Sequence, residues 1–444
     1  MARVPILASL VCSLFPVIAK ANDFAALRLD NWHQWRGPFA NGVAPHGDPP
    51  INWDEKTNIR WKVSIPGQGT STPIIWGDQI FLLTAIDTGR EAPPEALPKP
   101  DPRFETRTQP PKTYHQFVVL CVDRNTGKVR WQQVAVEQVP HEGHHPTHTY
   151  AAGSPTTDGK YLYVSFGSRG LYCYDLAGQL QWKRDFGLMH TRLGWGEAVT
   201  PVIHGSSLIV TWDQEADSFI TVLDAKTGQT KWKVDRDEHS TWSTPAVVEH
   251  KGRTQIIANG TNRARSYDLA TGEVLWQCGG QTVNPIPSPV VNGDTVICMS
   301  GYRGAAAQAI PLDSTKDITD KDQLIWKYDR GTPYVPSPLL YGDRLYFTQA
   351  LNPILTCLDA KTGEPKIDRE RLQGATGFYA SPAGAADRIY FVSRDGTTLV
   401  LKRSDKLEVL ASNRLDDPMD ASPVIVGKQL FLRGKEHLYC IEGK

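Results

Sequence analysis

The chain lacks the features that would assign it to several common classes of protein. It contains no P-loop and no Gly-x-Ser-x-Gly nucleophile elbow, so the sequence indicates neither a P-loop nucleotide site nor an α/β-hydrolase triad. Lys and Arg total 48, and Asp and Glu also total 48, so neither charge is in excess. Without a basic field, nothing in the sequence indicates binding to nucleic acid or to an anionic membrane.

Extended apolar segments are scarce, and the clearest one lies at the N terminus. Arg3 precedes a mostly apolar run over residues 4–18, and an A-x-A-like cleavage site follows at residues 19–21. This pattern predicts a secretory signal peptide over residues 1–21 and a mature chain that starts at Asn22, in the periplasm or secreted. A membrane anchor is the alternative, but the run is short for a transmembrane span.

The context of Cys12 does not match a lipoprotein signal, because Val11 stands where a small residue is expected. Removal of the signal peptide also removes Arg3 and Lys20, which leaves 46 basic residues (48 − 2) against 48 acidic residues, a net charge of −2. The mature chain is therefore expected to have no transmembrane segment and no strong charge.

A repeated turn-and-strand pattern organises the rest of the chain. Residues 222–232, VLDAKTGQTKW, combine β-forming residues, a Thr-Gly turn in which glycine takes a positive φ at little cost, and the start of an alternating strand. Related segments end at Trp131, Trp182 and Trp276, and another ends at Ile367 without the Trp. Such a repeat decides the fold.

A second landmark, Ser or Thr followed by Pro, opens a short apolar run in each copy. After a first gap of 82 residues, these prolines recur every 41–49 residues. Each unit is predicted to contain four antiparallel strands, too few to bury two faces alone, so the units must stack radially. The sequence therefore predicts an all-β fold, an eight-bladed β-propeller with four-stranded antiparallel blades. The prolines are Pro73, Pro155, Pro201, Pro245, Pro289, Pro338, Pro382 and Pro423.

The two ends of the repeat region each supply part of a blade. Residues 58–63 resemble an isolated Trp strand, and residues 421–444 supply strands without one. We therefore expect the last blade to be closed by the N-terminal strand of a single propeller over residues 58–444. Residues 22–57 are predicted to be an N-terminal arm that packs on the ring, and residues 86–115 are predicted to be a loop insertion in blade one.

Strand direction predicts which loops share a face. With strands A to D running from the axis outward, the tight A–B and C–D turns lie on one face, and the B–C loops and D-to-A crossovers lie on the other. The second set of loops is long and rich in aromatic and charged residues, and such loops on a rigid scaffold often carry function. The candidate ligand- or partner-binding residues on this face are Tyr150, Arg169, Arg192, Trp195, Glu197, Trp242, Arg263, Arg303 and Tyr334. They could equally fill the mouth of the axial channel.

The repeat, with Ser/Thr-Pro, a Gly-Asp turn, Leu-Asp-x-x-Thr-Gly and a closing Trp, resembles the pyrroloquinoline-quinone (PQQ)-like propeller family over roughly residues 58–444. That family includes eight-bladed quinoprotein alcohol dehydrogenases and the non-catalytic outer-membrane assembly lipoprotein BamB. The resemblance implies the fold more strongly than it implies an activity.

A quinoprotein site would, by this resemblance, require a Cys-Cys disulfide above the quinone, a stacking Trp below it, and carboxylate and amide ligands for Ca²⁺. The chain contains no Cys-Cys dipeptide. Trp195 or Trp242 could stack on a quinone, and Glu197, Asp213 or Glu215 could supply carboxylates. Packing within the loops or exposure of the charges to solvent would explain the same residues. PQQ and Ca²⁺ are therefore expected only under the alternative, quinoprotein interpretation.

Histidines are concentrated in one crossover. His141, His144, His145 and His148 lie together with Glu142 among them, and imidazoles at this density can bind Zn²⁺ or Cu²⁺. Pro146 interrupts the spacing, which favours a solvent-facing loop with one or two histidines packed on Tyr150.

The cysteines follow the repeat rather than a metal or redox pattern. Cys121, Cys173, Cys357 and Cys440 occupy one strand position, so we expect small buried side chains too far apart for disulfides. Cys278 and Cys298, in successive blades, form the one pair that could be bridged.

The sequence favours a secreted, non-catalytic propeller that binds a protein or extracellular ligand through its loop-rich face, as a monomer. The alternative is a PQQ-dependent quinoprotein oxidoreductase of the alcohol or sugar dehydrogenase type. A role like that of BamB is a narrower hypothesis, which would require a lipoprotein cysteine.

Overall fold

The computed structural model describes residues 24–99 and 101–443, so the predicted signal peptide lies outside the described residues. Helix is confined to short segments: α1 (Phe24–Leu27) and the 3₁₀ turns η1 (Arg28–Asp30), η2 (Pro94–Ala96) and η3 (Gly167–Arg169). Within the described ranges no helix has the length and hydrophobicity needed to cross a membrane.

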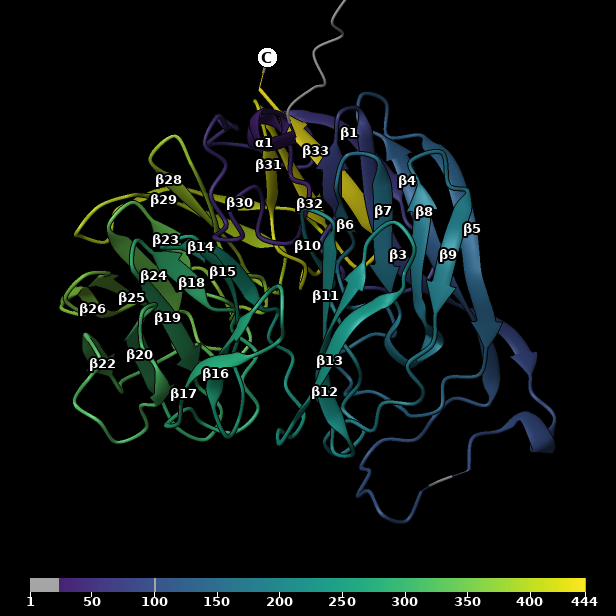
Figure 1. The fold of residues 1–444 in the computed structure, drawn as a ribbon. Coiled ribbons are helices and arrows are strands. Elements are labelled where there is room, and N and C mark those ends of the chain that lie inside the picture. Colours follow the sequence, from purple (N-terminus) through teal and green to yellow (C-terminus); the bar gives the residue numbers. More distant parts are fainter. Residues whose placement is uncertain (1–23, 100, 444) are drawn as a thin grey trace, which may run out of the picture.

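The strands form eight sheets arranged as a ring of blades, as predicted (Figure 1). From the axis outward, blade one is β2 (Ile74–Trp76), β3 (Gln79–Glu91), β4 (Thr113–Asp123) and β5 (Val129–Gln138); blade two is β6 (Thr156–Thr157), β7 (Tyr161–Ser165), β8 (Leu171–Asp175) and β9 (Leu180–Arg184); and blade three is β10 (Val202–His204), β11 (Ser207–Trp212), β12 (Ser218–Asp224) and β13 (Thr230–Arg236). Blade four is β14 (Ala246–His250), β15 (Arg253–Ala258), β16 (Ala264–Asp268) and β17 (Val274–Cys278); blade five is β18 (Val290–Asn292), β19 (Thr295–Ser300), β20 (Ala306–Pro311) and β22 (Trp326–Tyr328); and blade six is β23 (Leu339–Tyr341), β24 (Arg344–Thr348), β25 (Ile354–Asp359) and β26 (Pro365–Arg371). Blade seven is β27 (Ala383–Ala385), β28 (Arg388–Val392), β29 (Thr397–Lys402) and β30 (Val409–Arg414), and blade eight is β31 (Val424–Val426), β32 (Gln429–Arg433), β33 (His437–Glu442) and β1 (Ile59–Ser64).

The last blade joins the two ends of the repeat region, and this closure is confirmed. Strand β1 pairs antiparallel with β33, with Trp61 opposite Cys440. The ring can therefore open only if this blade comes apart.

Each Ser/Thr-Pro pair stands at the start of an inner strand, and in most pairs the hydroxyl links neighbouring blades. The amide of Thr72 donates to Ser154 Oγ at 3.0 Å, and seven of the eight steps around the axis make this contact, the last from the amide of Ser422 to Thr72 Oγ1 at 3.1 Å. The intermediate donors are Ser154, Thr244, Ser288, Ser337 and Ser381. Proline fits the following position, because a strand's first residue can forgo its ladder N–H.

The repeated Trp links blades on the outside of the ring. Trp182 Nε1 donates to Ala225 O at 3.0 Å, and its ring lies under Gly228 of the next blade's Thr-Gly turn. Blade five lacks that turn, so Trp276 has no partner for its Nε1. Instead, β21 (Lys316–Asp317), in the long connection between β20 and β22, pairs parallel with β17 opposite Trp276. Equivalent Nε1 hydrogen bonds are made by Trp61, Trp131, Trp232 and Trp326.

The N-terminal arm covers the face that carries the A–B turns. Asn31 Oδ1 accepts a hydrogen bond from the Gly77 amide, and the Asp48 amide donates to Gly427 O, so both contacts are made to turns of this face. Figure 1 shows the arm, in purple, at the top of the ring.

Arg36 anchors this arm at the axis. Its guanidinium is buried and donates to Pro382 O at 2.7 Å and to Pro338 O at 2.6 Å. Burial lowers the pKa of Arg36 to about 9, so it remains charged at neutral pH. We call the arm and the turns that it covers the closed end.

The blade-one insertion is more ordered than the predicted loop over residues 86–115. Strand β3 continues to Glu91 and β4 begins at Thr113, and the described residues between them, 92–99 and 101–112, are irregular apart from the turn η2. It projects at the lower right of Figure 1, in blue.

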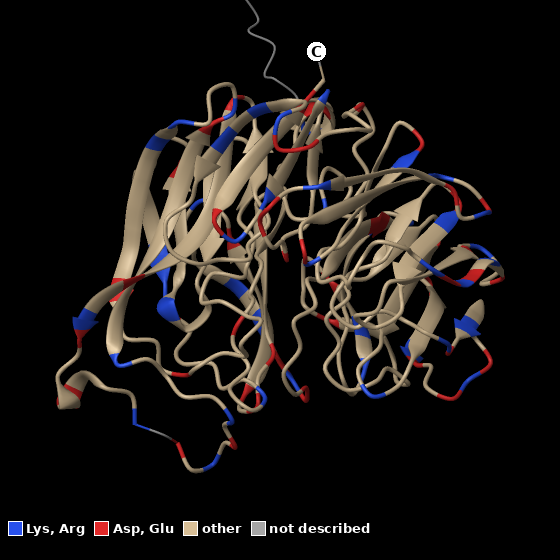
Figure 2. Cartoon of the chain, turned by 180° about the vertical axis from the view of Figure 1, so that it is seen from behind, with Lys and Arg blue, Asp and Glu red and all other residues tan. Residues whose placement is uncertain are grey.

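The six cysteines of the described residues are free and buried, including Cys278 and Cys298. Basic and acidic residues alternate over the outer strands and loops without forming one large field (Figure 2).

Candidate functional site

A cavity of about 380 Å³ lies on the axis at the face opposite the arm. Its walls come from D-to-A crossovers of several blades, with B–C loops contributing Tyr302 and Leu351, so these loops share one face as strand alternation predicted. We call this opening the axial cavity. It has the size of a small-molecule site.

Aromatic rings form much of the cavity wall. Trp195 and Trp242 lie 6.5 Å apart and nearly parallel, and the edge of Trp195 meets Tyr302 at 5.9 Å. Tyr302 in turn stacks on Tyr334 at 4.9 Å. Trp242 is fixed because its Nε1 donates to Gly196 O at 2.8 Å. Tyr379 completes this set.

The floor of the axial cavity is polar but uncharged. It consists of the Ser and Thr residues that precede the repeat prolines, including Thr72, Ser154 and Ser422, together with Trp35 from the arm. These hydroxyls accept a hydrogen bond from an amide of the preceding blade, so the floor offers O–H donors to a ligand and carries no full charge.

The predicted binding residues separate into two groups. Trp195, Trp242 and Tyr334 line the axial cavity. Tyr150, Arg169 and Glu197 instead line a smaller pocket behind its wall, with His141 and Glu142.

The three other predicted arginines contribute less to the cavity. The Arg192 amide donates to Ser240 Oγ. Arg263 pairs with Asp317 at 3.4 Å. Arg303 is exposed, with its guanidinium 5.3 Å from the centre of the Tyr302 ring at the rim.

The carboxylates near the axis do not fit a Ca²⁺–PQQ site. Asp213 is fully buried in a bidentate pair with Arg236, at 2.7 and 3.1 Å. Glu215 accepts a hydrogen bond from the Ser240 amide, and Glu197 lies outside the axial cavity. The one carboxylate that lines the cavity, Asp420, pairs with Arg394 at 2.7 Å. No three oxygen ligands therefore converge on the described part of the axis.

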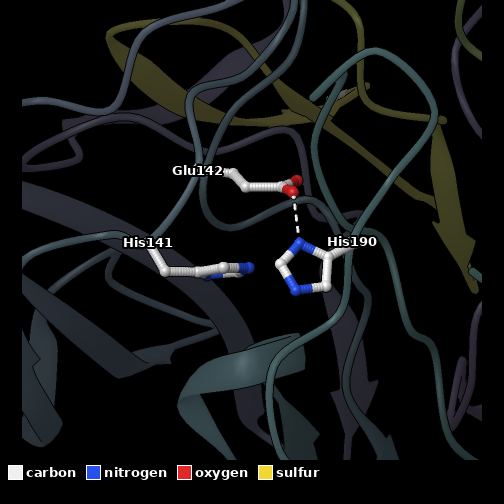
Figure 3. A group of neighbouring side chains, drawn as sticks. All are labelled: His141, Glu142 and His190. Carbon is white, nitrogen blue, oxygen red and sulfur yellow. Dashed lines mark hydrogen bonds and ion pairs between the residues drawn. The ribbon is translucent and has the colours of Figure 1, made fainter. Parts of the chain in front are cut away.

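A separate polar cluster lies behind the cavity wall, where the crossover after β5 meets the crossover after β9 (Figure 3). Ligand atoms of His141, Glu142 and His190 lie within 4.8 Å of one another. His190 Nδ1 is 2.9 Å from Glu142 Oε1, and His141 Nε2 is 3.7 Å from Glu197 Oε1.

Burial shifts two of these groups toward their neutral forms. It lowers the pKa of His141 to about 4, against the hydrogen bond to Met189 O. It raises the pKa of Glu197 to about 7, although Ser168 donates two hydrogen bonds to that carboxylate. Both side chains are largely enclosed, with exposed fractions of 10% and 17%.

Of the four candidate metal-binding histidines, the structure places only His141 in this cluster. His145 is exposed and its Nδ1 contacts Thr147 Oγ1, while His144 packs edge-on against Tyr150 at 4.5 Å. His148 lines the axial cavity, as does His145.

Sequence reasoning missed Glu142 and His190 as partners. Residues 141–145 do match the letters H-E-x-x-H, which place two histidines on one face when they lie on a helix. Here the segment is an irregular crossover, so His145 points elsewhere and His190 takes the second position. The letters could have drawn attention to Glu142, but no local signal identifies His190.

Comparisons with known proteins agree with this architecture. A family model described as outer membrane protein assembly factor BamB matches residues 115–368, more than half of the chain. The chain belongs to this family. No curated protein sequence matches this BamB-family propeller.

Solved structures resemble this BamB-family propeller at low sequence identity. BamB from Moraxella catarrhalis is 11% identical, with a TM-score of 0.51, covering 81% of this chain and 99% of its own. A europium-containing methanol dehydrogenase is 9% identical, with a TM-score of 0.62 and coverage of 93% and 92%. The C-terminal WD40 domain of Sif2 is 9% identical, with a TM-score of 0.50 and coverage of 88% and 100%. At these identities the likeness shows the fold alone.

Proposed function

We propose that this propeller is an exported, non-catalytic binding protein, and that its axial cavity receives an uncharged, ring-bearing part of a protein or other extracellular ligand. The observation that carries the proposal is the set of aromatic walls around a neutral hydroxyl floor. Aromatic rings of this kind dominate binding energy at interfaces when a partner covers them. The predicted signal peptide and the family description support export to the periplasm.

A quinoprotein oxidoreductase is the alternative function. It would need carboxylates free to hold Ca²⁺ and to act as a base, whereas Asp213 and Asp420 are each bound by an arginine. The residues at the axis therefore favour binding over quinone-dependent catalysis. The candidate residues Trp195, Trp242 and Tyr334 keep a role as cavity walls in our proposal.

The test is a binding screen with the mature chain, residues 22–444. A displayed library of random peptides is selected against it, and the selected peptides are measured by calorimetry. We expect them to be rich in aromatic residues and to bind at least tenfold more weakly to Trp195→Ala and Trp242→Ala variants. The control Lys251→Ala changes an exposed turn on the arm's side of the ring and should leave affinity unchanged.

The same protein preparation is titrated with PQQ and Ca²⁺ and assayed for dye reduction with alcohols and sugars. Tight stoichiometric binding with turnover would overturn the binding-protein proposal. Peptides that bind all variants equally would also contradict it, since the cavity would then not be the recognition site.

A further inference from the structure

We propose that His141, Glu142, His190 and Glu197 form a binding site for one divalent transition-metal ion, for which zinc has the most suitable ligand chemistry. This site is separate from the axial cavity. Two imidazoles and two carboxylates are a ligand set that zinc accepts, and imidazole also suits copper, iron and nickel.

Two contacts within the cluster have spacings close to those of a tetrahedral site. With zinc–ligand bonds of 2.0–2.1 Å, neighbouring ligand atoms lie about 3.3 Å apart. The Glu142–His190 contact is 2.9 Å and the His141–Glu197 contact is 3.7 Å, on either side of that value. The ligand atoms of His141, Glu142 and His190 all lie within 4.8 Å of one another, so shifts of at most about 1.5 Å bring these three to that spacing.

The charge balance also favours a cation. Glu142 and Glu197 are enclosed carboxylates, with 9% and 17% of their side chains exposed. In the described part of the chain neither carboxylate pairs with Lys or Arg. The nearby guanidinium of Arg169 donates instead to Val139 O and Gln138 Oε1. Buried carboxylates without a bonded cation are costly, and a divalent ion would neutralise both.

Hydrogen bonds already hold the carboxylates in place. Thr191 donates from its amide and its hydroxyl to Glu142 Oε2, which leaves Oε1 facing His190. Ser168 holds Glu197 by both oxygens, with its amide donating to Oε2 and its hydroxyl donating to Oε1. A Cβ at Gly167 would lie 1.7 Å from Glu197 Oε2, so the close approach of this carboxylate depends on glycine. Such outer contacts orient the ligands of known metal sites.

The blade-one insertion provides both a cover and an entry path. Phe104 stacks on the His190 ring at 4.3 Å, and the Arg107 amide donates to Leu193 O. A cavity of about 590 Å³ between the insertion and the two crossovers reaches His141, Glu142 and His190.

The bound ion would link the two crossovers, and both crossovers also contribute residues to the wall of the axial cavity. The first carries His145 and His148, and the second carries Trp195. Metal binding would therefore fix the position of the aromatic wall. On binding, His141 Nε2 exchanges its contact with Met189 O, at 2.8 Å, for the ion.

The experiment uses the mature chain after treatment with a chelator. Zn²⁺ is titrated by calorimetry, and Co²⁺ is added as a probe whose visible absorption reports a tetrahedral nitrogen and oxygen environment. We expect one ion per chain and a loss of more than a hundredfold in affinity for His190→Ala and Glu142→Gln. His144→Ala is the matched control, since this neighbouring histidine lies outside the cluster, and it should bind normally.

Each other outcome overturns the proposal. No binding by the native chain would mean that the four side chains form only a hydrogen-bonded network. Equal loss in His144→Ala would place the ion on the histidine-rich segment instead. If His190→Ala fails to fold, Glu142→Gln decides the question, because it keeps the shape of the side chain and one acceptor oxygen for Thr191 while removing the charge.

Discussion

The two ends of the propeller axis start from the same ring of Ser/Thr-Pro residues but are completed differently. At the closed end, the arm places the Arg36 guanidinium on carbonyls of Pro338 and Pro382, and Trp32 is 2% exposed. At the loop end, the ring is left as the floor of a cavity with half-buried aromatic walls. At the closed end the rings are buried and the arm is held by hydrogen bonds across the axis, whereas at the loop end the rings border open space.

This difference implies that the closed end contributes mainly to the stability of the fold and the loop end mainly to ligand binding. Buried, fully paired groups contribute to folding, whereas rings that face an open cavity gain most of their contact energy only when a ligand covers them. Strand direction makes the separation possible, because it sends the A–B and C–D connections, which are mostly tight turns, to one face and the B–C loops and crossovers to the other. Substitutions at the two ends should therefore have opposite consequences for stability and for binding.

The largest effect is expected from Arg36→Met at the closed end. The substitution keeps the length of the side chain but leaves the carbonyls of Pro338, Pro382 and Asn41 without their donor. Unpaired buried carbonyls cost about 1–3 kcal/mol each, and removal of the buried charge offsets part of this, so we expect a loss of about 3 kcal/mol in the free energy of unfolding. Urea denaturation measures it.

The control for this variant is Arg371→Ala, an exposed arginine at the end of strand β26, which should change stability by less than about 0.5 kcal/mol. Equal stability of Arg36→Met and the native chain would contradict a structural role for the arm.

Acid should weaken the closed end through His33. Burial lowers the pKa of His33 to about 3 from its ordinary value of 6.5, and the ring is 2% exposed. Between these pH values the unfolded chain binds a proton that the folded chain does not, so stability falls as the pH falls below 6.5. At pH 5 the loss is about 2 kcal/mol relative to neutral pH.

The comparison is made with His33→Phe, which retains a buried ring, and with His46→Gln, which changes an exposed histidine of the same arm. The slope of unfolding free energy between pH 7 and 5 should flatten in the first variant only. An unchanged slope in His33→Phe would show that other groups control the acid response.

The fold was predictable from the repeat, because a similar pattern of strands and turns recurs in the sequence of the blades. The face that gathers the long loops followed from strand alternation, and so did the placement of Trp195 and Trp242 on that face. The contacts that complete the two ends were not predictable. Arg36 meets Pro382 across 346 positions, and Glu142 meets His190 across 48. Each contact involves a segment outside the repeat, the arm or a crossover, where no period indicates which residues meet.

The smallest effect on stability is expected from Trp195→Ala at the loop end. Its ring contacts Trp242 and Tyr302 but borders open space, so its removal enlarges an existing cavity instead of creating a buried void. We expect a loss below about 1 kcal/mol, far less than the 3–5 kcal/mol typical of a buried tryptophan. Urea denaturation of this variant beside Trp32→Ala, at the closed end, measures the contrast directly. Equal losses in the two variants would mean that the aromatic wall is part of the folding core, and that the ends of the axis do not divide stability from binding.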